Sequence, residues 1–222
     1  MKIDMPLPEF MINLTTFDKY GDIIINRREE GHSWVRNAWN WMFAAMTDSV
    51  ANGGSAFGAG RMTVRNSAGT ISSGTTSTAN RSHATVPYSV GMVNSGTTVT
   101  LGIVVGRGIT DFNIDQVALA TLIAHGTAAN QLSYQAQAVP VTSYDPAAKA
   151  WSCLHSRNFL NNSAAAITVT EVGIMRNSPC FSTTTAVSML MARDLLSSGI
   201  VVPVAGSLQV QYEMKMSFAG ID

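Results

Sequence analysis

The segment that most restricts the possible folds of this chain lies near its C-terminal end, at residues 207–218. Apolar side chains stand at every second position of the segment, with polar residues between them. These apolar side chains are Leu208, Val210, Tyr212, Met214, Met216 and Phe218. Because successive side chains of a strand point to opposite faces, the segment predicts a strand with one apolar and one polar face over roughly 35 Å. Such a strand belongs to a sheet that is covered on one side.

Short β-prone runs separated by Gly, Asn and Ser continue over most of the chain after residue 60. Runs in such a succession are typical of an antiparallel β-sandwich or barrel, and a hydrophobic fraction of 46% is enough to fill its core. We therefore predict a mainly β fold. The expected strands are residues 61–66, 84–93, 97–105, 132–142, 150–159, 166–174, 186–192, 200–204 and 207–218.

The first 30 residues are expected to form an N-terminal arm and a first strand. Pro6 and Pro8 favour an extended arm because proline fixes the backbone angle φ. The β-branched run Ile23-Ile24-Ile25 then predicts the strand. Residues 31–222 are expected to form a single β-rich domain that also contains one N-terminal α-helix, at about residues 33–48.

The expected helix at 33–48 begins at Ser33, a residue type that caps helices. Its polar residues fall on one narrow stripe, so the apolar side chains spread over more than half of the circumference. An ordinary surface helix has a narrower apolar face. We infer that this helix is covered on two sides, by its own sheet and by another subunit. The candidates for the oligomer contact are Trp34, Trp39, Trp41 and Phe43.

Two stretches fit more than one secondary structure. Residues 115–124 are compatible with a short helix, and residues 186–196 contain good helix formers although a strand is expected there. The residue pattern alone leaves both open.

Composition excludes several classes of partner. Charged residues make up only 13% of the chain, about half the usual share, and the 14 basic and 14 acidic residues cancel. A chain without net charge has no electrostatic footprint for nucleic acid. No segment approaches the roughly 20 apolar residues that span a bilayer, and the N-terminus lacks a signal peptide's apolar run. We expect synthesis in a cytoplasm, with Cys153 and Cys180 as free thiols.

Motifs that resemble chemical sites are better explained as turns. Residues 111–115 have the spacing that starts a calcium loop, but Gln116 and Leu122 replace its glycine and glutamate. Residues 106–108 resemble part of a phosphate-binding loop that lacks its third glycine. The four histidines lack metal-ligand spacing, and no Gly-x-Ser-x-Gly marks a nucleophile. We expect no catalytic, cofactor-binding or metal-binding residues, and therefore no enzyme.

Charged and aromatic residues among the expected strands predict scaffold features. Glu171 interrupts the apolar face of residues 166–174, and a β-bulge near Thr170-Glu171 would restore that face. A buried Glu171 would then need a charge partner. The adjacent Arg193 and Asp194 predict a solvated ion pair at a strand end. We expect core positions, rather than a sugar-binding platform, for the aromatic residues Tyr88, Tyr134, Tyr144, Trp151 and Phe181.

Three parts of the chain resemble a loosely defined group of virion structural proteins of tailed bacteriophages. The first is Gly31-His-Ser-Trp-Val-Arg-Asn-Ala-Trp-Asn-Trp-Met-Phe43, which is similar to an N-terminal motif of that group, His-Ser-aromatic-Val-Arg-Asn. The others are residues 115–126 with 130–134, and residues 157–174 with 191–194 and 202–212. The resemblance implies a component of a phage particle and carries over no functional residues.

The expected function follows from the resemblance, the low charge, the arm and the helix. It is a non-enzymatic structural component of a bacteriophage particle, either a capsid decoration or a part of the tail or neck. The expected partners are further copies of the chain and other virion proteins, and the expected location is the virion, assembled in the bacterial cytoplasm. The alternative is a host-receptor or carbohydrate-binding module that binds a host surface glycan through loops such as 67–80 and 143–149.

Overall fold

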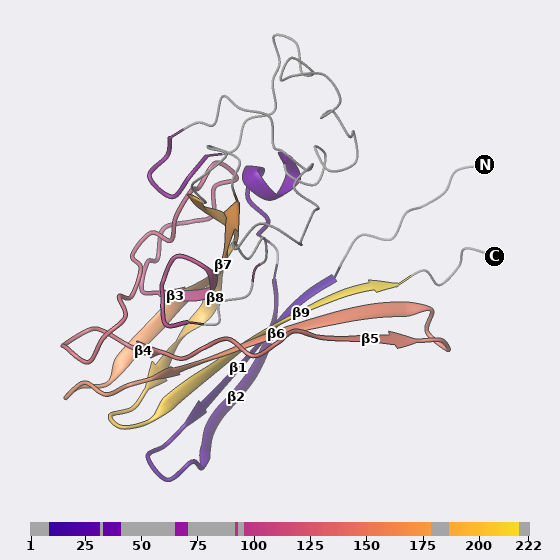
Figure 1. The fold of residues 1–222 in the computed structure, drawn as a ribbon. Helices are drawn as coiled ribbons and strands as arrows, with labels where there is room; N and C mark the ends of the chain where they lie inside the picture. Colours follow the sequence, from indigo (N-terminus) through magenta and orange to yellow (C-terminus); the bar gives the residue numbers. More distant parts are fainter. Residues whose placement is uncertain are drawn as a thin grey trace, which may run out of the picture.

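The structure, a computed structural model, describes residues 9–31, 33–40, 65–70, 92, 96–178 and 187–217. The described residues form nine strands in two antiparallel sheets (Figure 1). The strands are β1 (Glu9–Phe17), β2 (Ile23–Glu30), β3 (Gly102–Gly106), β4 (Ser133–Tyr134), β5 (Val141–Asp145), β6 (Ala150–Leu160), β7 (Ile167–Ser178), β8 (Val187–Val202) and β9 (Ser207–Ser217).

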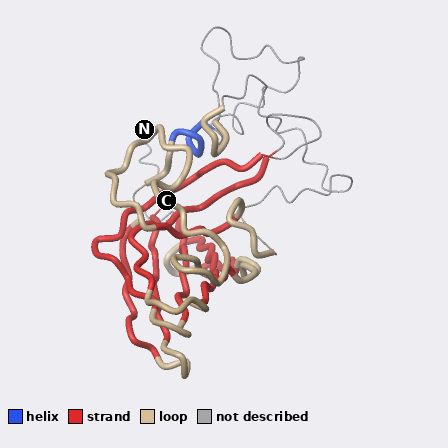
Figure 2. The backbone as a smooth tube through the Cα atoms, turned by 90° about the vertical axis from the view of Figure 1, so that its left-hand side faces the viewer, coloured by secondary structure: helices blue, strands red, loops and turns tan. Residues whose placement is uncertain are grey.

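The larger sheet has six strands in the order β2-β1-β9-β6-β4, with β5 paired to β6 as well. The smaller sheet has three strands in the order β3-β7-β8. The backbone trace of the described residues consists almost entirely of strands and loops (Figure 2). The prediction of a mainly β, antiparallel, sandwich-like fold is confirmed.

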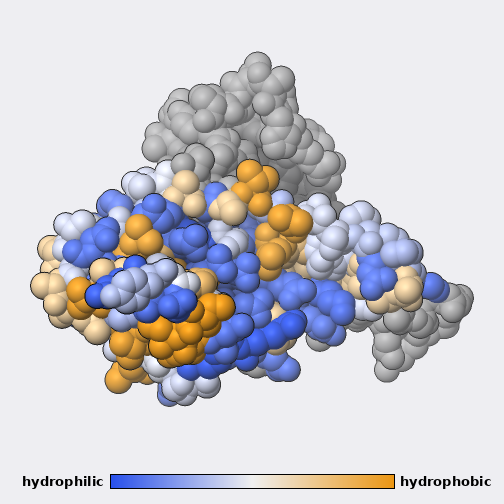
Figure 3. Space-filling model, turned by 90° about the horizontal axis from the view of Figure 1, so that it is seen from below, coloured by the Kyte–Doolittle hydropathy of each residue, from blue (hydrophilic) through white to orange (hydrophobic). Residues whose placement is uncertain are grey.

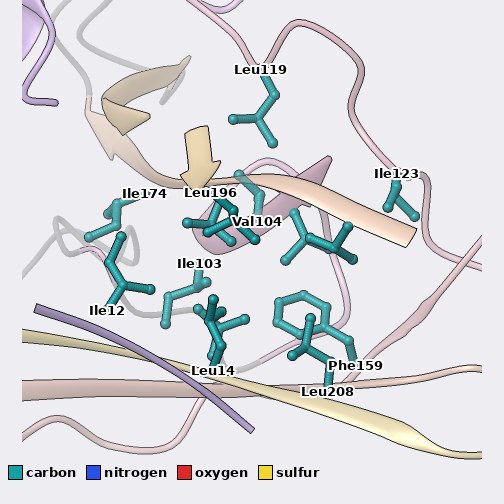
Figure 4. Packing of buried hydrophobic residues seen from close by; sticks show 14 of the residues in the cluster. Ile12, Leu14, Ile103, Val104, Leu119, Ile123, Phe159, Ile174, Leu196 and Leu208 are labelled. Carbon is teal, nitrogen blue, oxygen red and sulfur yellow. The ribbon is translucent and has the colours of Figure 1, made fainter. Parts of the chain in front are cut away.

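A single apolar cluster fills the space between the two sheets. Ile12 and Leu14 of β1, with Leu208 of β9, face Ile103 and Ile174 of the smaller sheet (Figure 4). All five side chains are at most 1% exposed. The burial of apolar area, which contributes roughly 25 cal/mol per Å², therefore joins the sheets.

Strand β1 was expected only as part of an extended arm, and this expectation is corrected by its pairing. It lies between β2 and β9, and Ile12 stands opposite Tyr212 in the register with β9. Alternate side chains of β1, Ile12 and Leu14 among them, point into the core. The alternation was present in the sequence, but Pro6 and Pro8 directed the interpretation toward an arm.

Little of the expected helix lies in the described part of the chain. Residues 36–40 form a helical turn, whereas residues 33–35 are not helical and Trp34 forms an isolated bridge with Ala192. The expected start of the helix at Ser33 is therefore wrong. Residues 41–48 of the expected helix and arm residues 1–8 lie outside the described residues, so these parts stay predictions.

The two stretches whose secondary structure the sequence leaves undecided are not helical in the structure. Residues 115–124 form turns and bends, with one isolated bridge between Leu122 and Gly106. The good helix formers of 186–196 lie within the long strand β8, because pairing with β7 overrides their helix propensity. The β7–β8 register shifts between Val169 and Glu171. The irregularity lies where the bulge was predicted, but the extra residues belong to β8, because Thr170 alone stands opposite residues 196–199.

Glu171 forms the predicted ion pair, and its partner is Arg193 of β8. Glu171 Oε2 accepts a hydrogen bond from Arg193 Nε at 2.6 Å, and both side chains are fully buried. Backbone N–H groups complete the carboxylate's shell, and they belong to Gly108 (2.9 Å), Ala120 (3.1 Å) and Thr121 (2.7 Å). The Arg193 guanidinium also donates to the carbonyl of Thr110 and to Gln116 Oε1. One buried pair thus holds the loop after β3 against the smaller sheet.

The glycines of residues 106–108 make room for this carboxylate. A Cβ atom at Gly106 or at Gly108 would lie only 2.5 Å from Glu171 Oε1. The glycine pair that resembles a nucleotide-binding fragment is therefore explained by the close approach of a carboxylate from within the chain.

Arg157 is a second buried cation, and backbone carbonyls surround it. Its side chain is 1% exposed and stands over the ring of Tyr134, with 4.9 Å between the guanidinium carbon and the ring centroid. Burial lowers the pKa of Arg157 to about 10. Its guanidinium donates hydrogen bonds to the carbonyls of Gly96, Thr98, Leu101, Ile103 and Gln135. Arg157 thereby fastens residues 96–103 to the larger sheet.

The prediction of a solvated Arg193–Asp194 pair is wrong. Both residues lie inside β8 and are buried, and neighbouring strand residues point to opposite faces. Arg193 turns to Glu171, whereas Asp194 Oδ2 accepts a hydrogen bond from the Tyr212 hydroxyl at 3.0 Å. Burial and the neighbouring Asp194 carboxylate raise the pKa of Tyr212 well above its usual value.

Replacing Glu171 by Gln should lower the free energy of unfolding by about 3–5 kcal/mol, because Arg193 is left as an uncompensated buried charge. Urea denaturation followed by circular dichroism measures the loss. Glu213→Gln is the matched control. Its partner Arg28 is exposed, so a change within about 1 kcal/mol is expected. Equal small losses in both variants would contradict a structural role for the buried pair.

Candidate functional site: an uncovered apolar face

The larger sheet continues beyond the point where the smaller sheet covers it. Strands β6 and β9 pair over their whole lengths, and β5 pairs with the first five residues of β6. Figure 1 shows β5, β6 and β9 running on together while β7 and β8 diverge from them. We call the outer part, residues 141–145, 150–154 and 213–217, the extension.

The inward face of the larger sheet stays apolar along the extension. Tyr144, Trp151 and Met216 form one cross-strand row, on the side of the sheet that carries Tyr212. They are 47%, 53% and 39% exposed, whereas Tyr212 is 1% exposed. The rings of Tyr144 and Trp151 lie 4.9 Å apart between centroids. A face that forms the core at one end is thus open at the other.

This uncovered face carries no charged side chain within the extension. Thr142, Cys153 and Met214 form the next cross-strand row, in which Thr142 is exposed and the other two are half-buried. The charged residues Asp145, Glu213 and Lys215 fall on the opposite side by strand alternation. We define the uncovered face by Tyr144, Trp151, Cys153, Met214 and Met216.

Sequence patterns predicted part of this surface. The alternation at 207–218 is confirmed as the apolar face of β9, and its first half is buried. The core positions expected for Tyr144 and Trp151 are wrong, whereas Tyr134 is fully buried as expected. No signal along a single strand tells where a facing sheet diverges, so the exposed half could not be found from the sequence.

The four predicted contact residues are only partly placed. Trp34 packs within its own subunit, edge-on to Phe10 with ring centroids 4.8 Å apart. Trp39 is 47% exposed. Trp41 and Phe43 lie outside the described residues.

Exposed apolar residues also occur outside the extension. The lower side of the molecule is largely hydrophilic, with apolar side chains gathered in a few groups (Figure 3). Ile23 and Ile24, at the start of edge strand β2, are 61% and 52% exposed. The aromatic residue near them, Tyr20 in the β1–β2 turn, is 78% exposed and has the Lys19 ammonium 4.8 Å from its ring centroid, so this patch is charged.

A thiol, an imidazole and an amide meet beside the uncovered face. Cys153 Sγ lies 3.5 Å from His155 Nε2, and His155 Nδ1 lies 3.2 Å from Gln137 Nε2. The amide orientation is fixed because Gln137 Oε1 accepts a hydrogen bond from the backbone N–H of Ile103. Gln137 Nε2 is therefore a donor, and His155 Nδ1 must accept.

This arrangement does not activate Cys153. With Nδ1 accepting, the neutral imidazole carries its proton on Nε2, the atom that faces the thiol, so that atom is unable to take the thiol proton. Burial lowers the pKa of His155 and raises the pKa of Cys153, which keeps both groups neutral. The trio serves as a polar connection between Gln137 and β6.

A polar cavity of about 360 Å³ lies near the helical turn. Arg36, Asn37, Arg65 and Asp115 contribute to its lining. The Arg36 guanidinium makes two hydrogen bonds to the Asp115 carboxylate, and this contact lowers the pKa of Asp115. Asn113 Oδ1 accepts from the Asp115 N–H at 2.9 Å, which confirms the expected side-chain-stabilised turn. The charges of Arg36 and Asp115 therefore neutralise each other within the cavity.

Metal-binding groups and membrane-spanning helices are both absent from the described part of the chain. No group of three or more His, Cys, Asp and Glu side chains there is arranged to hold a metal ion. No helix among the described residues has the length and apolar character to cross a membrane. In comparisons with protein-family models, with curated proteins and with solved structures, the chain matches none.

Cys153 should alkylate with iodoacetamide at neutral pH more slowly than a small free thiol, because burial raises its pKa. In a Cys180→Ser background, His155→Gln should change the rate by no more than about threefold, since the imidazole does not act as a base. Mass spectrometry of the labelled protein gives the rate. A tenfold slower reaction in His155→Gln would show that the imidazole does activate the thiol.

Proposed function

We propose that the chain is a non-enzymatic structural subunit of a bacteriophage particle, a capsid decoration or a tail or neck component, that associates with copies of itself. The uncovered face is the observation that carries the proposal of self-association. The phage context is supported by the resemblance of the segments at 31–43, 115–134 and 157–212. The low charged fraction of 13% suits a surface that neighbours cover.

The uncovered face has the composition of a protein contact. Aromatic residues and methionine are enriched in interfaces, and charged residues are depleted from interface centres. Covering the exposed half of Trp151 removes roughly 100 Å² of mostly apolar surface, which contributes about 2.5 kcal/mol. Tyr144 and Met216 add to this gain in the same row.

Trp39 and the N-terminal arm supply further contacts in this proposal. Trp39 projects from the helical turn with about half of its surface exposed. Copies joined through more than one surface assemble into closed symmetric particles, the usual form of a homo-oligomer.

Purified protein should have a mass several times that of the 23.6 kDa subunit in light scattering. Trp151→Glu should lower this mass, because a buried carboxylate in the contact is costly. Val141→Glu is the matched control, since Val141 is 62% exposed on the opposite side of the same extension. A subunit-sized wild type at every concentration would refute the proposed function.

A second function, binding of a host surface glycan, is favoured by one specific observation. Tyr144 and Trp151 present two adjacent exposed rings, with an angle of 37° between their planes. Both residues flank the turn at 146–149, within the loop region where recognition was expected. Exposed aromatic faces of this kind bind the C–H surfaces of sugars.

Glycan binding predicts a signal on a glycan array that Trp151→Ala reduces at least tenfold and that Val141→Ala leaves unchanged. The loss follows from removing one of the two stacking rings. Titration calorimetry with the best glycan checks the affinity. An array without signal would leave self-association as the function of the face.

A further inference from the structure

The geometry points to a specific occupant for the uncovered face: we propose that it binds the N-terminal segment, residues 1–8, of a second copy of the chain. This inference rests on the proposed self-association and names the two surfaces that meet.

The size of the uncovered face favours a segment over a folded surface. The extension contains five residues from each of three strands, which corresponds to an area of roughly 14 × 16 Å, or about 230 Å². Strand β1 borders it through residues 9–11, where Phe10 already packs on Trp34. A stable interface between folded proteins needs about 800 Å² from each partner. Two such faces packed on each other would fall well short, whereas a single extended segment covers this width.

The sequence of residues 1–8, Met-Lys-Ile-Asp-Met-Pro-Leu-Pro, matches such a face. The apolar residues Met1, Ile3, Met5 and Leu7 alternate with polar residues and prolines. In an extended chain these four side chains project to one side, over roughly 20 Å. Lys2 and Asp4 project to the other side and stay in water. An uncharged apolar row thus meets an uncharged apolar face.

Proline restricts the segment to this extended form. Pro6 and Pro8 fix their own φ angles, and each also disfavours a helical conformation of the residue before it. Such restrictions reduce the entropy that association of the segment in an extended form would otherwise cost.

The direction of β1 selects a second copy over the segment's own subunit. Glu9, the first residue of β1, stands opposite Lys215, and β9 ends two residues later at Ser217. Because β1 runs antiparallel to β9, its N-terminal end at Glu9 points along β9 toward the outer end of the extension. Returning to its own uncovered face would require a reversal at Pro6 and Pro8. Donation from each copy to the next is a head-to-tail contact, which gives a ring where the rotation between copies closes and a filament where it does not.

Mixing two defective variants tests the donation. A chain lacking residues 2–8 keeps the face but has no segment, and Trp151→Glu keeps the segment but has a damaged face. Each variant alone should have a lower mass than the wild type. In an equimolar mixture with an affinity tag on one variant, we expect capture of the other, and a species of about twice the 23.6 kDa subunit mass.

A peptide experiment tests the contact directly. A fluorescent peptide of residues 1–8 should bind the chain that lacks residues 2–8, as measured by anisotropy. Adding Trp151→Glu to that chain should weaken binding at least tenfold, whereas Val141→Glu should leave it unchanged. A peptide with Ile3, Met5 and Leu7 changed to Ser should not bind.

The outcomes separate this inference from the proposed function. If deletion of residues 2–8 leaves the wild-type mass, or if the mixed variants do not capture each other and the peptide does not bind, the inference is wrong. An oligomer that Trp151→Glu alone dissociates would then still support self-association. Glycan binding without peptide binding would assign the face to the second function, and a wild type that is always monomeric would refute the proposed function itself.

Discussion

The buried pair of Glu171 and Arg193 is the constraint on which the rest of the structure depends. It lies where the β7–β8 register shifts, and the loop after β3 donates backbone N–H groups to it. Two charges taken out of water are tolerated only when hydrogen bonds complete their shells. The pair therefore holds the loop after β3, β7 and β8 together.

The smaller sheet covers only part of the larger sheet, and this leaves the uncovered face. The strands of the two sheets overlap around the core and then separate (Figure 1), so the same side of β9 carries the buried Tyr212 and the exposed Met216. No special residue type is needed for this. An apolar strand face becomes a contact surface wherever its covering layer turns away, and Trp151 with Tyr144 makes this one aromatic.

The sequence predicted where strands lie better than it predicted which of their side chains are buried. Period-two alternation predicted β9, and the misplaced Glu171 predicted a register irregularity and a charged partner, although not that the extra residues belong to β8. The environment of Arg193 and the exposure of Trp151 depend on segments distant in sequence, so their patterns gave wrong expectations. The candidate site could be predicted only as an apolar strand face, without knowing which half is open.

The crowding of Gly106 and Gly108 against the Glu171 carboxylate has an evolutionary consequence. A side chain at either glycine would displace the Glu171 carboxylate. Loss of the charge on Glu171 or Arg193 would leave the other charge buried without a partner. No single substitution at these four positions is therefore neutral. Proteins descended from this chain would be expected to keep all four residues, Gly106, Gly108, Glu171 and Arg193, or to replace them together. Covariation among these four positions would therefore identify relatives whose remaining sequence has diverged.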